Sequence, residues 1–451
     1  MSAGLGLRPF AQIDALCSHY ARSVDEGALA VILQRHSTAH RVPGAALGLL
    51  RHGEPVAAYC GVADVRTQSP VTASTRFAIG SLTKTMVASA LAVLDFEHRL
   101  SLDDSVASRV PELRLCEWAE TATLRDLMAN RSPVPLRATL EFGFTDHVGD
   151  DDEALARLVT QIAGEAPSGE HWSYTNVGWC VLGRVIETVT GLVWEEAMAR
   201  LLAPAGLNDT SWTTSAIVDR AVGHEARRGG PIPVEPLLCR AFSPAGATIA
   251  STLEDMLRFA RWQLADSVPA PLRVVHADVS IGGWLDAWGL GLGRFDWDGA
   301  EVWGWDGMVN GQRSVLRLLP DRSGAVVILS NSSAGRAMGR SILAEVVPSS
   351  FGINVATARL DPSPDVPEQL RAYAGAYGWP DRRVDVTEAA QGLVVSEDGI
   401  IKEALPLDRR TFLLDREDPD AATISFDHFD RTGRPGVLYD MVWGLGRLRH
   451  S

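Results

Sequence analysis

Ser81 and Lys84 are the residues best suited to do chemistry, because they stand three positions apart at the head of an apolar helical segment. On a helix, residues i and i+3 share one face, with Cβ atoms about 5–6 Å apart. A serine hydroxyl becomes an effective nucleophile when a nearby base takes its proton. Lys84 can be that base when it is neutral, and both burial and the positive end of the helix dipole lower its pKa. Arginine does not deprotonate in proteins, so this chemistry requires lysine.

Lysine is rare in this chain. Of its 42 Lys and Arg residues, only Lys84 and Lys402 are lysine. A GC-rich genome accounts for the general scarcity, but not for a lysine kept at position 84. The structural alternative is that Ser81 merely caps the helix while Lys84 extends towards solvent, and the S-x-x-K spacing also arises by chance.

Tyr174 and Asn176 form a second candidate pair, in a loop just before another apolar helix that stops at Gly191. A tyrosine beside a lysine cation can have a lowered pKa and can relay protons. Asparagine offers both a donor and an acceptor. Taken alone, a core tyrosine followed by a loop asparagine is the commoner interpretation.

The segment "WGWDGMVNGQ", residues 303–312, is a third candidate. Gly304, Gly307 and Gly311 flank a strand-like stretch, and glycine at 307 lets a substrate approach the backbone closely. A glycine-rich hairpin without function is the alternative interpretation.

In this order the three pieces resemble the serine β-lactamase and penicillin-binding superfamily, in particular its class C β-lactamase-like hydrolases and esterases. Residues 81–84 match the S-x-x-K motif of that superfamily, and residues 174–176 match the Tyr-x-Asn motif of its class C branch. Flanking stretches such as "VPGAALGLLRHG", "RLSLDDSV" and "LLAPAGLNDTSW" are similar too. The resemblance extends over about residues 25–340.

The resemblance implies roles for these residues. Ser81 would be the acylated nucleophile, Lys84 and Tyr174 would share the general base and acid roles, and Asn176 would position Lys84 and the substrate. The backbone N–H groups of Ser81 and Met308 would form the oxyanion hole. The third motif of the family would fall on Trp305, Asp306 and Gly307.

Two stretches depart from the family pattern. Relatives usually carry a cation or an imidazole where this chain has Trp305, and we expect an indole neither to bind a substrate carboxylate nor to influence Tyr174. The substitution therefore favours a neutral or aromatic substrate, or a cation beside Asp306 and the indole face. The stretch "LMANRSPVPLR", residues 127–137, also differs from relatives and predicts a reshaped loop at the border of the site.

The order of elements predicts an α+β fold. We expect a helix over residues 10–34, a β-hairpin at 43–64, a mostly helical middle, and two or three antiparallel strands at 300–333. Strands at both ends of a domain usually pair in one antiparallel sheet, with helices packed on it, and the resemblance implies an all-helical subdomain beside it. The predicted domains are a catalytic domain at 1–357, a proline-rich linker at 358–369, and a small β domain at 370–451. The last of these resembles the β-barrel or lipocalin-like domain often appended to such hydrolases.

Bulk properties narrow the function. A net charge of −14 argues against nucleic acid or an anionic membrane as a partner. The five scattered cysteines and the absence of a signal-like start favour a cytoplasmic protein with reduced thiols. The spacing of the 11 histidines suggests no metal, and we expect no cofactor.

Three hypotheses remain open: a serine hydrolase acting on a small ester or amide, an acyltransferase in which an alcohol or amine intercepts the acyl-enzyme, and a non-catalytic binding protein on this fold. The sequence does not indicate the oligomeric state.

Overall fold

The first sheet strands form the hairpin that the sequence predicts. Strands β1 (Gly44–Arg51) and β2 (Glu54–Asp64) pair in antiparallel register. His52 and Gly53 connect them with φ angles of 50° and 83°, as a two-residue turn that matches the twist of the strands requires. The computed structural model describes residues 25–142, 149–167, 171–213, 220–236, 239–265, 267–281, 285–356, 370–414 and 423–448.

The helix before this hairpin differs from the prediction. Helix α2 (Glu26–Ala39) begins after Asp25, whose side chain accepts a hydrogen bond from Ala28 N at 2.8 Å. It continues past Gln34, the predicted end, and residues 10–24 of the predicted helix lie outside the described residues.

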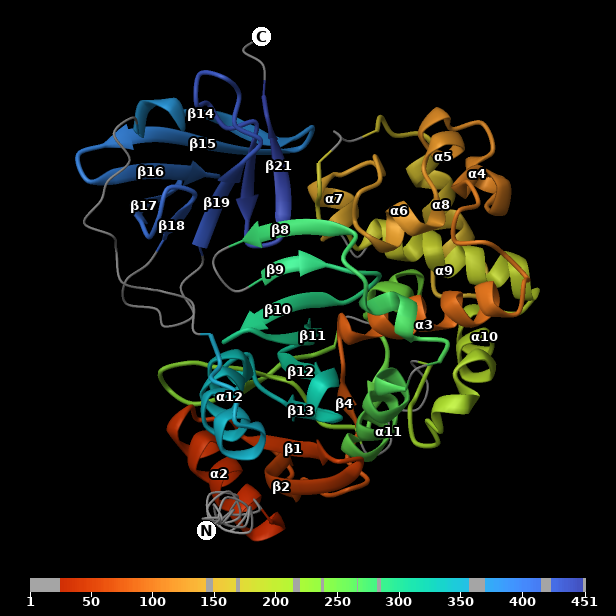
Figure 1. Cartoon of the computed structure of the whole chain (residues 1–451), viewed down its shortest axis with the longest axis vertical. Coiled ribbons are helices and arrows are strands. Elements are labelled where there is room, and N and C mark those ends of the chain that lie inside the picture. The colour runs from red at the N-terminus through yellow and green to blue at the C-terminus, as the bar shows by residue number, and fades with distance from the viewer. Residues whose placement is uncertain are drawn as a thin grey trace, which may run out of the picture.

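One antiparallel sheet joins both ends of the first domain, as predicted (Figure 1). Strand β1 pairs with β13, which lies almost 300 positions later in the chain. The strand order is β3-β2-β1-β13-β12-β11-β10-β9-β8. The later strands are β3 (Ser69–Pro70), β8 (Ala277–Ile281), β9 (Leu285–Trp288), β10 (Gly293–Trp297), β11 (Ala300–Val309), β12 (Gln312–Leu319) and β13 (Gly324–Ser330).

Helices cover both faces of this sheet. Every residue of β13 is buried, which requires cover on both sides. Helix α11 (Leu253–Leu264) places Leu253 and Leu257 against Gly48 on one face, beside α3 (Leu82–Phe96), while α12 (Gly335–Phe351) and α2 pack on the other. Helix α11 starts after the cap Thr252.

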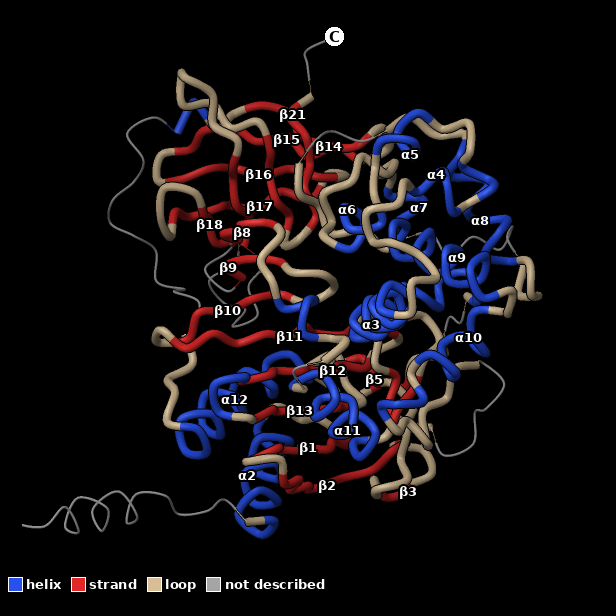
Figure 2. The backbone as a smooth tube through the Cα atoms, turned by 45° about the vertical axis from the view of Figure 1, so that its right-hand side comes forward, coloured by secondary structure: helices blue, strands red, loops and turns tan. Residues whose placement is uncertain are grey.

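A helical subdomain lies at one end of the sheet (Figure 2). Its longest helix, α9, ends at Gly191 with φ 71°, as predicted. Its members are α4 (Val106–Arg109), α5 (Glu117–Thr121), α6 (Leu124–Met128), α7 (Ala138–Glu141), α8 (Ala154–Ala163), α9 (Val177–Thr190) and α10 (Trp194–Leu201).

The C-terminal part forms a closed antiparallel β-barrel, in agreement with the predicted small β domain. Its interior is filled by aromatic side chains such as Tyr377, Phe412 and Phe426, each at most 1% exposed, so it is a packed core. The predicted linker at 358–369 lies outside the described residues. The strands are β14 (Gly375–Trp379), β15 (Arg382–Ala389), β16 (Gly392–Glu397), β17 (Ile400–Pro406), β18 (Thr411–Leu413), β19 (Thr423–Asp427), β20 (Val437–Asp440) and β21 (Trp443–Arg447).

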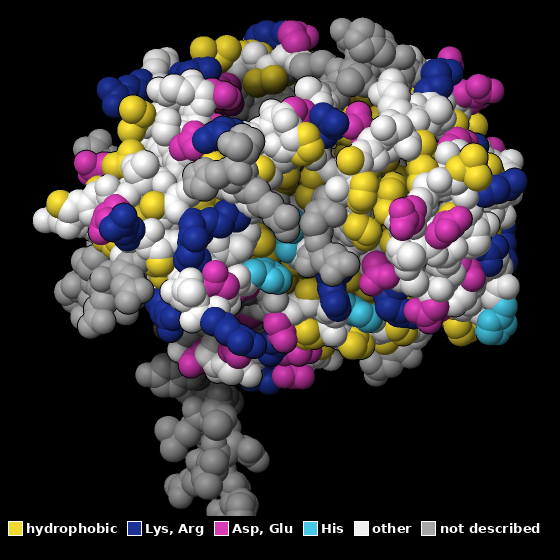
Figure 3. Space-filling model, turned by 90° about the horizontal axis from the view of Figure 1, so that it is seen from above, with side chains coloured by type: hydrophobic (Ala, Val, Ile, Leu, Met, Phe, Trp, Pro, Cys, Tyr) yellow, Lys and Arg dark blue, Asp and Glu magenta, His cyan; other side chains and the backbone are white. Residues whose placement is uncertain are grey.

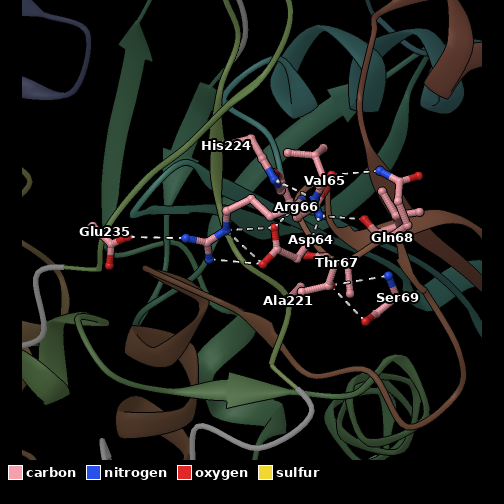
Figure 4. A network of polar contacts seen from close by, with 12 residues as sticks. Asp64, Val65, Arg66, Thr67, Gln68, Ser69, Ala221, His224 and Glu235 are labelled. Atoms are coloured by element: carbon pink, nitrogen blue, oxygen red, sulfur yellow. Dashed lines mark hydrogen bonds and ion pairs between the residues drawn. The ribbon is translucent and has the colours of Figure 1, made fainter.

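A polar network at the end of β2 holds the segment 220–236 in place (Figure 4). Arg66 pairs with Asp64 at 3.0 Å and with Glu235 at 3.6 Å. Beside them the buried His224 lies within hydrogen-bond distance of Val65 N and donates its own backbone N–H to Gly311 O at 3.2 Å. The network therefore supports the turn between β11 and β12, just beyond the third candidate motif.

Neither a single membrane-spanning helix nor a metal site is found among the described residues. No single helix is long and apolar enough to cross a bilayer; α9 and α10 reach that size only together, and they are bent by 78° where they meet. No group of three or more His, Cys, Asp or Glu side chains among these residues is placed to hold a metal ion.

Candidate active site

Ser81 stands at the N-terminus of helix α3, and its hydroxyl makes no capping hydrogen bond. Instead, Lys84 Nζ lies 3.1 Å from Ser81 Oγ, as the i, i+3 spacing predicts. Among the described residues, no acceptor receives the backbone N–H of Ser81, which is usual in the first turn of a helix. The interpretation of Ser81 as a simple helix cap therefore does not hold.

Lys84 is fully buried, so it does not extend to solvent. Burial lowers its pKa to about 7, in the direction that the apolar helix predicts. Besides Ser81, its amine contacts Asn176 Oδ1 at 2.8 Å and Ala245 O at 2.6 Å. Both of these oxygens only accept hydrogen bonds, so they bind the two N–H groups of the neutral amine. The lone pair of that amine is then directed at the Ser81 hydroxyl.

Tyr174 completes this cluster from the loop before α9. Its hydroxyl interacts with the Ser81 side chain, which lowers the pKa of Tyr174 against the effect of burial, and its ring centroid lies 4.9 Å from Lys84 Nζ. Its pKa is nevertheless well above the usual tyrosine value, because burial outweighs its hydrogen bonds. The lowered pKa expected from the nearby lysine is thus not found, because at 4% exposure desolvation of the phenolate dominates.

Trp305 contacts Tyr174 directly, which corrects the expectation that an indole cannot influence this tyrosine. Trp305 Nε1 donates a hydrogen bond to Tyr174 Oη at 3.2 Å, and the two rings stack with centroids 5.5 Å apart. Trp288 packs edge-on against the same indole at 4.6 Å. The indole N–H is a donor, and it lowers the pKa of Tyr174 against the effect of burial.

Asp306 has a cation from the chain itself. Arg317 Nη1 lies 2.6 Å from Asp306 Oδ1, and the arginine side chain is only 7% exposed. The substrate cation considered for this position is therefore not required, since the Asp306 carboxylate is already paired and the Trp305 ring is packed between aromatic neighbours.

Gly307 allows a close approach to its backbone, but the group that approaches is another segment of the chain and not a substrate. A Cβ atom at this position would lie 1.9 Å from Ile79 O, and Ser314 Oγ donates a hydrogen bond to the same oxygen at 2.6 Å. Strand β11 is thereby held against the segment that leads into Ser81. A Cβ on Gly80, which has φ 53°, would lie 2.6 Å from Met308 N, so the backbone near Ser81 approaches the second predicted oxyanion donor.

The stretch 127–137 borders the cluster, as expected. Asn130 O accepts a hydrogen bond from Ser173 N at 3.0 Å, and Asn130 Oδ1 accepts one from Trp179 Nε1 at 3.3 Å. Met128 O accepts from Trp288 Nε1 at 3.0 Å. The loop thus supports both Tyr174 and the aromatic group around it.

The barrel also reaches this cluster, which the sequence does not reveal. Val442, in the turn between β20 and β21, accepts a hydrogen bond from Tyr174 N at 3.0 Å. The adjoining Trp443 packs edge-on against the Tyr174 ring, with centroids 6.2 Å apart. Ser173 Oγ accepts from Gly444 N at 3.1 Å. One hairpin of the barrel is therefore part of the wall around Tyr174.

Glu141 is a further residue that the motifs do not identify. Its buried carboxylate accepts hydrogen bonds from Thr175 Oγ1 and Asn176 N, and burial raises its pKa to about 7. The one available signal is compositional: Glu141 is the single acidic residue between Asp126 and Asp146.

The comparisons with known proteins agree with this arrangement. The model of the Beta-lactamase family matches residues 29–346. Penicillin-binding protein 4 of Amycolatopsis lactamdurans is 30% identical over 365 residues, covering 75% of this chain and 94% of that protein. A D-aminopeptidase of Cereibacter sphaeroides is 26% identical over 317 residues, or 67% of this chain and 60% of the aminopeptidase.

Solved structures extend the similarity to the barrel. The crystal structure of SurE aligns with 95% of this chain and 100% of its own, at a TM-score of 0.77 and 26% identity. The structure of SurE with D-Leu aligns with 94% of this chain and 99% of its own, at a TM-score of 0.73 and 25% identity. By its matching family model, its relatives and its fold, this chain belongs to the Beta-lactamase family of serine hydrolases.

Proposed function

We propose that the protein cleaves an ester or amide through an acyl-enzyme on Ser81. The observation that carries this proposal is the 3.1 Å contact between Ser81 Oγ and a buried Lys84 amine. That amine has a pKa of about 7 and two further partners that only accept hydrogen bonds. A non-catalytic binding protein has no need for a buried lysine placed in this way.

In the proposed first step, Ser81 Oγ attacks the substrate carbonyl carbon while neutral Lys84 takes the hydroxyl proton. The backbone N–H groups of Ser81 and Met308 stabilise the oxyanion. The bond to the leaving group then breaks, and the leaving alcohol or amine takes a proton relayed through Tyr174. Water finally attacks the acyl-enzyme, which releases the acid and returns the proton to Ser81.

We further propose that the acyl group contains a D-amino acid residue. Two relatives support this class: the D-aminopeptidase and SurE, whose structure was determined with D-Leu. Trp305 carries no charge, and the cation beside Asp306 is already paired with that carboxylate. The third motif therefore offers no free cation to a substrate carboxylate. A D-residue fits these surroundings when its own carboxyl group forms the ester or amide bond that is cleaved, because it then has no free carboxylate.

Acyl transfer is the second candidate, favoured by a cavity between α7 and the barrel. This cavity, of about 320 Å³, is lined by Phe142 and Trp443 and by barrel side chains of both charges, among them Arg382, Arg383 and Glu397. Trp443 contacts Tyr174 from the wall of this cavity, so an acceptor alcohol or amine held there would lie next to the site. Figure 3 shows acidic and basic side chains interspersed on the face over the barrel and the helical subdomain.

The experiment is an intact-mass measurement of wild type and Ser81→Ala after mixing with p-nitrophenyl acetate and butyrate. A gain of one acyl group in the wild type alone supports the Ser81 acyl-enzyme, and no gain in either protein contradicts it. D-Leu and L-Leu p-nitroanilides then test the configuration. Faster loss of the adduct when an amine is added favours transfer over hydrolysis.

A further inference from the structure

Glu141 forms the end of the short helix α7 and is buried directly behind Asn176, at 2% exposure. Its carboxylate accepts hydrogen bonds from Asn176 N at 2.6 Å and from Val177 N at 3.3 Å. These two N–H groups belong to the first turn of α9, where backbone donors have no partner within the helix. The side chain of Asn176 does not cap this helix, so Glu141 does so from another segment.

The same residue also orients the side chain of Asn176. The backbone oxygen of Glu141 accepts a hydrogen bond from Asn176 Nδ2 at 2.9 Å, which turns Asn176 Oδ1 towards Lys84 at 2.8 Å. The opposite amide orientation would place an NH₂ group against the lysine amine. Glu141 therefore holds both the backbone and the amide of the residue that holds Lys84.

At its other end, α7 is attached to the barrel. Asp381, in the turn between β14 and β15, accepts hydrogen bonds from Ala138 N at 2.8 Å and from Thr139 N at 3.1 Å. Phe142, which directly follows Glu141, packs edge-on against Trp443 with centroids 5.1 Å apart. A continuous set of contacts thus runs from the barrel through α7 and Asn176 to Lys84.

We propose that Glu141 is a positioning residue through which the docked barrel sets the geometry of the Ser81–Lys84 pair. The proposal deepens the proposed function and rests on it. The titratable side chains that interact with the Glu141 carboxylate are Lys84, Tyr174 and Cys180. Its negative charge raises the pKa of Lys84 against the lowering effect of burial.

A measurement of Lys84 itself provides a test that needs no turnover. The chain has only two lysines, so protein labelled at the lysine side chain gives one NMR signal from buried Lys84 and one from exposed Lys402. In Glu141→Gln the titration midpoint of Lys84 is expected to fall below that of the wild type, because an anion near the amine is lost. Glu187→Gln, which changes another buried glutamate bonded to Arg184, is the matched control and is expected to leave the midpoint unchanged.

Acylation kinetics test the positioning. With p-nitrophenyl butyrate, Glu141→Gln is expected to lower the maximal acylation rate on the order of 10²-fold, as a misplacement of about 1 Å does, while the midpoint of the pH profile moves down. Thr175→Val removes the hydroxyl that donates to Glu141 and accepts from Gly178 N; it should also slow acylation, and Thr175→Ser, which keeps both hydrogen bonds, should restore it. This pair keeps the test decisive if Glu141→Gln fails to fold.

The contribution of the barrel is tested by Asp381→Ala against Asp430→Ala. Asp430 also accepts backbone N–H groups, but within its own barrel turn. Only Asp381→Ala is expected to slow acylation and move the Lys84 midpoint.

The outcomes separate the two proposals. If wild type never acylates, the proposed function fails, while the Lys84 titration still tests Glu141. The positioning role is overturned if Glu141→Gln and Glu187→Gln have the same Lys84 titration midpoint and their acylation rates agree within about twofold. If Asp381→Ala matches Asp430→Ala, the link to the barrel is overturned.

Discussion

The indole N–H of Trp305 donates a hydrogen bond to the phenol oxygen of Tyr174, with the two heavy atoms 3.2 Å apart and the rings stacked. In this chain the third motif thus acts on the tyrosine through a neutral donor, where the resemblance led us to expect a cation or an imidazole. The donor opposes the effect of burial on Tyr174 without adding a charge to the site.

Trp305→Phe is expected to keep the stacking and lose the donor. The pKa of Tyr174 should then rise further, and the ester hydrolysis rate should fall about fivefold, for a hydrogen bond worth about 1 kcal/mol. Trp305→His restores an N–H group and should change substrate preference while acylation persists. Trp303→Phe, which loses an indole donor to Glu301 on the same strand, is the control. Equal rates for Trp305→Phe and Trp303→Phe would contradict the role of the donor.

The pH profile should follow the neutral form of Lys84. Its pKa of about 7 means that the unprotonated base is scarce below pH 7 and abundant above it. We expect kcat/KM for p-nitrophenyl butyrate to rise about tenfold per pH unit below that value and to level off above it. Lys84→Arg should lose nearly all activity, while Lys402→Arg should keep it. A rate that declines from pH 6 to pH 8 would rule out lysine as the base.

Gly307→Ala should disturb the segment before Ser81. The new Cβ would meet Ile79 O at 1.9 Å, and relieving this overlap must move either β11 or the start of α3. Overpacking of this kind costs about 1–3 kcal/mol. Urea unfolding and ester hydrolysis should both show the loss. Gly229→Ala, where no atom lies within 4 Å of the new Cβ, should show neither.

Trp443 should stabilise the docked barrel through its ring alone. Its Nε1 has no hydrogen-bond partner among the described residues, while its ring packs against Tyr174 and Phe142. Trp443→Ala is therefore expected to lower the free energy of unfolding by about 1–3 kcal/mol and to slow hydrolysis. Trp443→Phe should come close to the wild type in both thermal unfolding and kinetics. A large loss in the phenylalanine variant would point to a polar role of the indole.

Local patterns in the sequence predicted much of the scaffold. The hairpin at 43–64, the buried helix α3 and the end of α9 at Gly191 each depend on residues within a few positions of one another. The pairing of Ser81 with Lys84 belongs to this class too, because one helical turn brings them together. The antiparallel sheet followed from the order of these elements, and the C-terminal barrel was expected from the resemblance.

The remainder of the site depends on contacts between distant parts of the chain. Lys84 meets Asn176 and Ala245 across 92 and 161 positions, and Trp305 meets Tyr174 across 131. Tertiary packing brought the indole against the tyrosine, gave Asp306 its partner and placed a barrel hairpin beside Tyr174. Glu141 illustrates the difference best. No motif contains it, since its role arises only when α7 is packed between the barrel and the N-terminus of α9.

The sequence alone determined which side chains could do chemistry, because residue type and local spacing decide that. Only the tertiary structure decided which neighbours surround them, and burial by those neighbours lowers the pKa of Lys84 and raises that of Tyr174.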